Sequence, residues 1–201
     1  MEIARAAARL FVTQGLRATR AEDIAQAAGI APRTFYRYFA TKEEAVSPLY
    51  TAGAQRWTEA VRAAPADLPV PQALEHAVRH TLTPGPGVSA ASWEWARTLI
   101  RLADTSPAVR KVWAGVCQAS ERTLAEVLAT RATQRDDNVA DAPPITPELR
   151  FAAAVASAAI RVAVEAWATS DAQADGPDGP AALALRNLAA LRDFTWQTGP
   201  G

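Results

Sequence analysis

The sequence predicts an all-α protein with a small N-terminal helical domain and a larger C-terminal helical domain. Apolar side chains recur at helical spacing, and prolines and glycines divide the chain into segments of helix length. No alternating strand pattern or hairpin turn signal competes with this pattern. A length of 201 residues suffices for two small domains. We place the boundary between residues 1–46 and residues 47–201.

The first three helices are predicted within residues 1–46. An alanine-rich helix comes first and ends near Gly15. The second covers residues 21–28 and ends at Gly29, because glycine tolerates the positive φ of a helix terminus. Pro32 then begins the third, since its fixed φ suits a first helical turn. Two helices joined by a tight glycine turn are the layout of a helix-turn-helix.

The third helix, residues 33–40, divides its side chains between two faces. Phe35 and Phe39 form a packing face and are expected to build a small core with Phe11. Tyr36 fits either that core or the surface. The other side chains of this helix are hydrogen-bond donors that point elsewhere: Arg33, Thr34, Arg37 and Tyr38.

Residues 3–46 contain an ordered set of motifs at fixed spacing: Leu10-Phe11, Gly15, Asp23-Ile24-Ala25, Gly29-Ile30, Thr34-Phe35-Tyr36-Arg37-Tyr38-Phe39 and Lys42-Glu43. This set resembles the DNA-binding domain of TetR-family transcriptional regulators. The string PRTFYRYF is most similar to the actinobacterial branch that includes mycofactocin-linked regulators.

The resemblance implies that the third helix reads the major groove of DNA. Arg33 and Arg37 are expected at base edges, where a guanidinium bridges guanine O6 and N7 for ~1–3 kcal/mol of discrimination. Phosphate contacts, by contrast, set register rather than sequence. The side chains expected near phosphates are Thr19, Arg20, Thr34, Tyr36, Tyr38 and Lys42.

Three features depart from the family pattern. Arg20 replaces a capping Ser or Thr, so Thr19 and Glu22 are expected to form a shifted capping box, with Arg20 either at the DNA backbone or in solvent. Ala31 leaves the third helix uncapped, at a cost of ~1 kcal/mol that Pro32 partly offsets. The chain also begins without a basic arm, which predicts either no minor-groove contact or a missing N-terminal segment.

Positive charge is concentrated in the N-terminal domain. The whole chain has 21 basic and 21 acidic side chains, which excludes a nonspecific polycation. Residues 1–42 alone have seven basic and three acidic side chains, a balance of +4. This places positive charge where DNA would lie.

Cysteine content and hydropathy predict the compartment. The single Cys117 excludes an internal disulfide framework and is expected to be a small buried residue, with a redox-sensing thiol as the alternative. We find no signal peptide and no apolar run of membrane length. The sequence therefore predicts a soluble, cytoplasmic protein with no membrane partner.

Six further helices are predicted after residue 46, separated by loops that contain proline or glycine. Residues 134–144 are polar and are predicted to form a mobile loop. The predicted helices cover residues 48–64, 71–82, 93–103, 108–133, 147–168 and 180–196.

The last two helices are the expected dimer surface. Residues 147–168 are rich in alanine and small β-branched side chains, which allow another helix to approach closely, and residues 180–196 have leucine at helical spacing. With their symmetry mates they would form a four-helix bundle; alternatively they only close an intramolecular core. The resemblance implies a two-fold homodimer on a palindromic operator.

The middle helices are expected to enclose an effector. Their aromatic side chains suit an apolar or aromatic ligand with few polar anchors, although ordinary core packing explains the same tryptophans. Glu94 is a further candidate anchor. Resemblance to the mycofactocin-linked branch implies an acyl-CoA ligand. The residues expected at this site are Trp93, Arg97, Arg101, Trp113, Cys117 and Trp167.

An enzyme is the competing class. His76 and His80 stand at i and i+4, a spacing that metal ligands use, but no third ligand is near them in sequence. The chain has no Gly-rich phosphate loop and no nucleophile elbow. We therefore expect no enzyme, metal or cofactor, but a homodimeric repressor released from its operator by a small apolar or acyl ligand. A ligand-dependent activator and a ligand-independent architectural DNA-binding protein are the alternatives.

Overall fold

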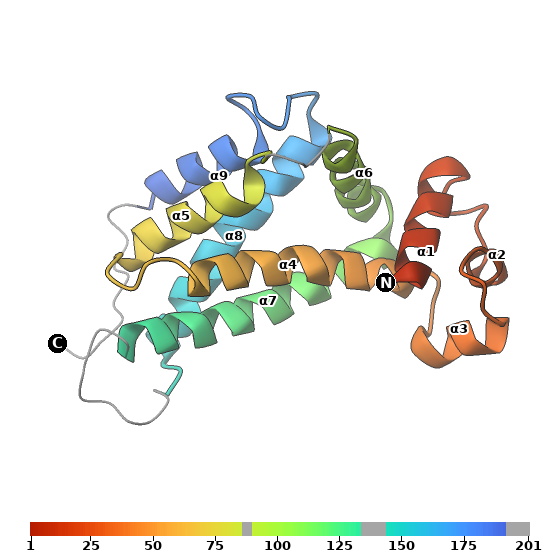
Figure 1. Ribbon diagram of the computed structural model, residues 1–201, viewed down its shortest axis with the longest axis horizontal. Coiled ribbons are helices and arrows are strands. Elements are labelled where there is room, and N and C mark those ends of the chain that lie inside the picture. The colour runs from red at the N-terminus through yellow and green to blue at the C-terminus, as the bar shows by residue number, and fades with distance from the viewer. Residues whose placement is uncertain (86–89, 134–143, 192–201) are drawn as a thin grey trace.

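The computed structural model describes residues 1–85, 90–133 and 144–191, and within these ranges it contains helices and no strand (Figure 1). The predicted all-α fold is thus confirmed. The helices are α1 (Glu2–Thr13), α2 (Ala21–Ala27), α3 (Pro32–Tyr38), the 3-10 helix η1 (Glu43–Val46), α4 (Ser47–Arg62), α5 (Val70–Leu82), α6 (Ala90–Thr105), α7 (Pro107–Thr133), α8 (Pro147–Thr169) and α9 (Pro180–Ala189).

The three short helices α1, α2 and α3 form one end of the molecule. The long helices α4 and α7 extend side by side from that end toward α5, α8 and α9 (Figure 1). Helix α6 crosses between the two parts and packs against both α7 and α8. Helix α7 in turn contacts η1, so α6 is connected to the N-terminal helices through α7.

Two apolar cores stabilise this arrangement. The first lies among α4, α5, α7, α8 and α9 and contains Leu74, Leu128 and Ile160. The second begins in the N-terminal helices, where Phe11, Ile24 and Phe35 are almost completely buried, and continues into α6 and α7. Leu99, Ala103, Val109 and Val116 are its members from α6 and α7. The N-terminal domain therefore shares its core with the helices that follow.

Helix boundaries differ from the sequence expectations at α6 and α9. Helix α6 begins at Ala90 rather than near residue 93 and ends at Thr105. Helix α9 ends at Ala189, although the leucine pattern predicts continuation to residue 196. Residues 192–196 lie outside the described residues, as does nearly all of the predicted loop at 134–144.

Among the described residues, only α8 is long and apolar enough to cross a membrane by length and composition. The expectation that no apolar run of membrane length exists is therefore wrong for this helix. Its most apolar 18-residue window has a mean hydropathy of 1.5, and half of that window is buried inside the fold. Contacts with α6, α7 and α9 account for its apolar character, since a core helix needs the same composition.

Candidate DNA-binding surface and effector region

The turn between α2 and α3 follows a Schellman motif. The Ile30 N–H donates to the Ala25 carbonyl (2.9 Å), and the Gly29 N–H donates to the Gln26 carbonyl (3.0 Å). Gly29 has φ of +69°, the left-handed conformation that closes such a motif and favours glycine. Helix α3 then begins at Pro32, and Ala31 before it makes no side-chain capping bond, as predicted.

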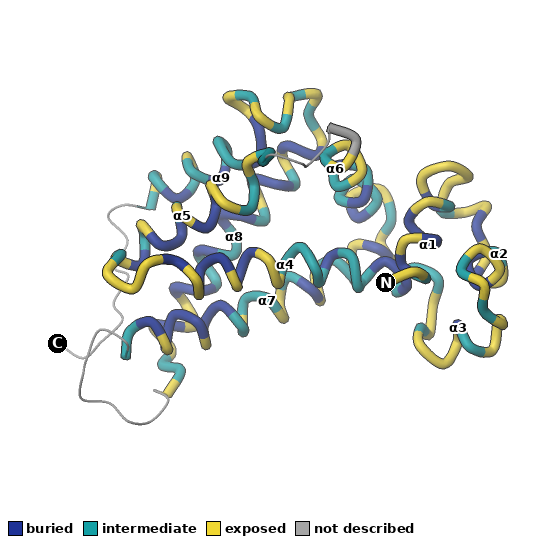
Figure 2. Tube along the Cα trace, viewed as in Figure 1, coloured by how far each residue is buried: buried dark blue, intermediate teal, exposed yellow. Residues whose placement is uncertain are grey.

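Helix α3 is anchored by Phe35 and exposes most of its other side chains (Figure 2). Phe35 is fully buried and contacts Phe39 with ring centroids 5.5 Å apart. Arg33 and Arg37 are exposed, and Tyr38 is 61% exposed. A short helix held by one aromatic side chain thus presents two guanidinium groups and a phenol to the exterior.

Tyr36 belongs to the surface rather than to the core. Its side chain is 52% exposed, and its hydroxyl donates to the Glu22 carboxylate (3.2 Å) on α2. Partial desolvation raises the pKa of Tyr36, and the negative charge of Glu22 raises it further. Tyr38 instead contacts its neighbour Arg37, whose guanidinium lies 5.1 Å from the ring centroid. Thr34 is half-buried on the same helix.

The start of α2 corrects the predicted capping box. Arg20, not Thr19, is the N-cap residue, and its N–H donates to the Asp23 carboxylate (2.8 Å). This bond lowers the pKa of Asp23, and the Arg20 guanidinium contributes to the same effect from 3.3 Å. The Thr19–Glu22 box is wrong because the Thr19 hydroxyl is directed inward and donates to the Gly15 carbonyl (2.9 Å).

Two residues expected near DNA phosphates are engaged within the protein. Thr19 is completely buried. The Lys42 ammonium donates to the main-chain carbonyls of Leu16 (2.7 Å) and Thr19 (2.8 Å), which belong to the α1–α2 connection. Both side chains therefore hold this connection together. The exposed Arg20 guanidinium stays available at the surface.

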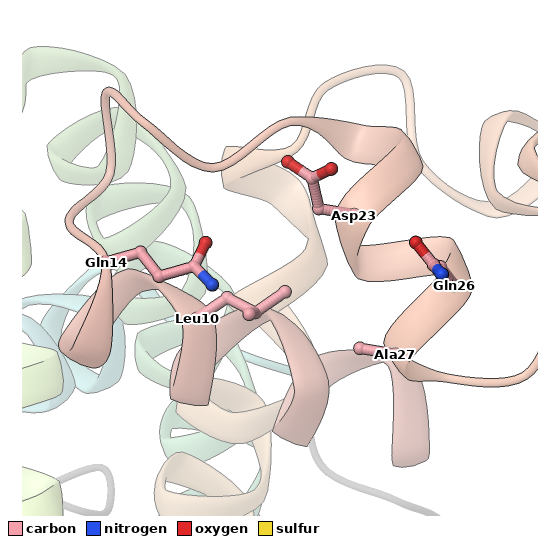
Figure 3. A pocket seen from close by; sticks show the side chains of 5 residues that line it. All are labelled: Leu10, Gln14, Asp23, Gln26 and Ala27. Atoms are coloured by element: carbon pink, nitrogen blue, oxygen red, sulfur yellow. The ribbon is translucent and has the colours of Figure 1, made fainter.

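A surface groove lies between α1 and α2 (Figure 3). Two apolar side chains, two amides and a carboxylate line it. The Asp23 carboxylate already accepts the Arg20 N–H, so this group has a structural role at the groove. The lining residues are Leu10, Gln14, Asp23, Gln26 and Ala27.

Three of the six predicted effector residues cluster where α6 meets the end of α8. The Trp93 and Trp167 rings meet edge to face, with centroids 5.7 Å apart. The Arg97 guanidinium lies 4.5 Å from the Trp167 ring centroid and pairs with Glu94 (3.3 Å). Arg97 also donates to the Ala172 carbonyl, which accepts from the Trp167 indole nitrogen as well (3.1 Å).

Arg101 also contacts the C-terminal end of α8. It donates to the Ala168 carbonyl and to the Ser170 carbonyl (2.9 Å). The last carbonyls of a helix lack intrahelical partners and carry partial negative charge, so a guanidinium stabilises them. Arg101 therefore fastens the C-terminus of α8 to α6. It is less free to bind a ligand than the sequence alone indicates.

Trp113 and Cys117 form a separate group on α7. The Trp113 indole nitrogen donates to the Glu165 carboxylate (2.7 Å), and Arg161 pairs with the other oxygen of Glu165 (3.0 Å). Burial, and secondarily the charge of Glu165, raise the pKa of the Cys117 thiol to about 12. Such a thiol is not a reactive thiolate near neutral pH, which argues against the redox-sensing alternative.

Tyr50 is a connecting residue that sequence reasoning missed. Its hydroxyl donates to the Leu99 carbonyl of α6 (2.6 Å), and its ring meets Trp113 of α7 edge to face at 5.1 Å. Burial raises the pKa of Tyr50. Tyr50 stands four residues after η1, so it links both α6 and α7 to the start of α4. An isolated tyrosine in an apolar helix gives no sequence signal of this role.

The histidine pair on α5 is exposed at both positions, His76 and His80. Within the described ranges, no group of three or more His, Cys, Asp or Glu side chains is placed to hold a metal ion.

Comparison with known proteins identifies the family. A family model described as "Bacterial regulatory proteins, tetR family" matches residues 3–46. Over 169 residues the chain is 30% identical to the HTH-type transcriptional regulator TcmR of Streptomyces glaucescens. The aligned region covers 83% of this chain and 71% of TcmR. The chain belongs to the TetR family of transcriptional regulators. Its relatives are regulators rather than enzymes.

Another sequence relative and two solved structures are similar to this TetR-family chain. The HTH-type transcriptional repressor KstR2 of Mycobacterium tuberculosis is 48% identical over 48 residues, 24% of each chain. FadR of Thermus thermophilus is a repressor solved in complex with lauroyl-CoA, and its structure matches with a TM-score of 0.59 at 20% identity. The superposition covers 100% of this chain and 97% of the FadR chain. FadR of Bacillus halodurans has a TM-score of 0.56 at 21% identity, with 95% of both chains covered.

Proposed function

We propose that this chain is a homodimeric, ligand-responsive repressor that binds a palindromic operator in the cytoplasm. The observation that carries the proposal is the surface of α3, where Phe35 is buried while Arg33 and Arg37 stay exposed. These two guanidinium groups are assigned to base edges in the major groove. Arg20, Thr34, Tyr36 and Tyr38 are assigned to the phosphate backbone, which fixes register.

The proposal assigns one role to each of the two domains. Residues 1–46 bind DNA, and residues 47–201 bind the effector and form the dimer. Thr19 and Lys42 receive a supporting role, because their polar atoms are engaged with main-chain carbonyls inside residues 1–46. They act on DNA affinity through the position of the α1–α2 connection.

Helices α8 and α9 are proposed as the dimer surface. Val162 of α8 is 48% exposed and Phe151 is 61% exposed, and the half-buried Val155 and Ala158 lie between them at helical spacing. An apolar stripe along a helix is typical of a surface that a partner covers. A two-fold dimer would place two α3 helices about 34–36 Å apart, one DNA turn.

An acyl ligand is proposed as the effector. The resemblance of the α3 sequence to mycofactocin-linked regulators motivates this class, and the similarly folded Thermus thermophilus FadR binds lauroyl-CoA. The aromatic side chains of α6, α7 and α8 support an apolar ligand body. Tyr50 supplies a direct contact between α6 and α4 through which a ligand-dependent shift would reach the DNA-binding domain. Coupling of this kind is typically about 1–3 kcal/mol.

The test is selection of bound duplexes from a random DNA pool by the purified protein, followed by release with acyl ligands. A palindromic enriched site from which a ligand releases the protein supports the proposal. Enrichment without release contradicts the proposed acyl effector, and ligand-dependent tightening supports an activator. Binding without any enrichment, lost at moderate salt, contradicts sequence-specific regulation and supports the architectural alternative.

A further inference from the structure

Two buried hydrogen-bond donors on α6 lack a protein partner. They are the Trp93 indole nitrogen and the Arg97 Nε, and among the described residues neither has an acceptor. Leaving a buried donor unsatisfied costs about 1–3 kcal/mol, and more for a charged group. Most buried polar groups in folded proteins are satisfied. Two orphaned donors one helical turn apart therefore require an explanation.

The two donors belong to one cluster. Trp93 and Arg97 are i and i+4 on α6, so they lie on the same face of that helix. Both contact Trp167 of α8, Trp93 by its ring edge and Arg97 by its guanidinium face. The other groups of the Arg97 guanidinium are engaged by Glu94 and the Ala172 carbonyl, so its plane is fixed and Nε is left over.

The chemistry of this cluster selects its ligand. Both orphaned groups are N–H donors, so they require an acceptor. The Arg97 side chain is 8% exposed, whereas its counter-ion Glu94 is 63% exposed and screened by solvent. The positive charge of Arg97 is therefore incompletely compensated inside, which favours a negative or strongly polarised oxygen. Tryptophan rings on two sides favour an apolar body attached to that oxygen.

We propose that Trp93 and Arg97 together bind the carbonyl oxygen of an acyl effector, either as a free carboxylate or as a thioester. The proposal rests on the proposed function, because it assumes that the C-terminal domain takes an effector. Arg101 is excluded from this role because it holds the Ala168 and Ser170 carbonyls. The ligand oxygen would supply the acceptor that both donors lack, beside the helix end that Arg101 fastens.

The test compares Trp93→Phe with Trp95→Phe in the full-length protein. Phenylalanine at 93 keeps an aromatic ring against Trp167 and removes only the N–H and part of the ring system. Trp95 lies on the same helix at 36% exposure and serves as the matched control. Calorimetric titration with dodecanoate and with dodecanoyl-CoA distinguishes the two sources of the carbonyl. Thermal unfolding of each variant confirms that it is folded.

The wild-type protein is expected to bind one of the two probes, and Trp93→Phe is expected to weaken that binding roughly tenfold, as loss of one hydrogen bond implies. Trp95→Phe should leave affinity within about twofold. Arg97→Lys should weaken binding as well, because lysine retains the charge but lacks the Nε–H.

Equal affinities of Trp93→Phe and the wild type would mean that water satisfies the donor, and would overturn the proposal. Binding of neither probe by the wild type, or equal losses in Trp93→Phe and Trp95→Phe, would overturn it too. Operator binding is measured separately without ligand. Specific operator binding with no probe bound refutes only this inference, whereas probe binding without operator binding refutes the proposed function.

Discussion

Two pairs of arginines, one at each end of the molecule, occupy opposite environments. Arg33 and Arg37 on α3 are exposed. Arg97 and Arg131 in the C-terminal domain are only 7% and 5% exposed, and their guanidinium groups donate to main-chain carbonyls. The chain thus uses one residue type for two purposes. It presents charge to a partner at one end and completes helix termini at the other.

The difference shows that a count of positive charges indicates a DNA-binding surface in the N-terminal domain but is misleading about ligand anchors in the C-terminal domain. A helix C-terminus leaves carbonyls unpaired, and a buried guanidinium has enough donors to satisfy several of them. Arg131 donates to the carbonyl of Val61 in the last turn of α4 and to those of Ala64 and Pro65 just beyond it. An arginine within an apolar helix of the C-terminal domain is therefore a stabilising group before it is a ligand anchor.

The largest expected effect comes from Arg131→Met. Methionine fills part of the space but removes the donors that Arg131 gives to the carbonyls at the end of α4, so the unfolding free energy should fall by about 3–5 kcal/mol. Chemical denaturation measures the change. Arg79→Met is the matched control, because Arg79 is exposed on α5 and pairs only with Glu75, and it should change stability by about 0.5 kcal/mol or less. Similar losses from both would erase the distinction between buried and exposed arginines.

Lys42→Met is expected to have the next largest effect, this time within the N-terminal domain. Removal of the ammonium frees the Leu16 and Thr19 carbonyls, so stability should fall by about 2–3 kcal/mol. DNA affinity should drop for all sequences together, because the α1–α2 connection shifts. If Lys42→Met instead keeps full stability and only reduces the salt dependence of binding, Lys42 is a phosphate contact and its internal bonds are dispensable.

Arg37→Ala should reverse that pattern. Among the described residues its guanidinium contacts only the neighbouring Tyr38, so the unfolding free energy should change by about 0.5 kcal/mol or less. Discrimination between the selected operator and single-base variants should fall by about 1–3 kcal/mol at one position per half-site. Competition binding with a set of variant duplexes measures this loss. An equal loss on every duplex would assign Arg37 to the backbone instead.

Sequence patterns predicted the helix-turn-helix well because its determinants are local. Gly29 sets the turn by its own φ, Pro32 starts α3 by its own ring, and Phe35 is the apolar side chain of its helix. The predicted cap of α2 is wrong because the N-cap residue is Arg20, whose side chain cannot accept a hydrogen bond. The Arg20 main-chain N–H donates instead to the carboxylate of Asp23, three residues later.

The effector region was less predictable because its partners are distant in sequence. Trp113 and Glu165 are 52 residues apart, and Arg97 and Ala172 are 75 residues apart. The aromatic content of α6 to α8 indicates the helices that make these contacts, and their role in effector binding stays a prediction. Which arginine nitrogen stays unpaired depends on where the end of α8 lies, and no local pattern specifies that position.

The smallest expected effect is the pH dependence of the α2 cap, where the exposed Arg20 acts on its own domain. The Arg20 N–H, and secondarily its guanidinium, lower the pKa of Asp23 below its usual value of 3.8. A lowered folded-state pKa stabilises the protein above the unfolded-state pKa, and that contribution disappears as pH falls through the folded-state value.

Asp23→Asn keeps an acceptor for the N–H and removes the titration, so its stability should fall less steeply than that of the wild type below about pH 4. Arg20→Gln retains the main-chain donor, and should therefore keep most of the wild-type slope. Denaturant unfolding at a series of acidic pH values measures the three slopes. If Arg20→Gln flattens the curve as much as Asp23→Asn does, the guanidinium rather than the main-chain bond sets the Asp23 pKa, and this exposed arginine stabilises its helix as the buried ones do.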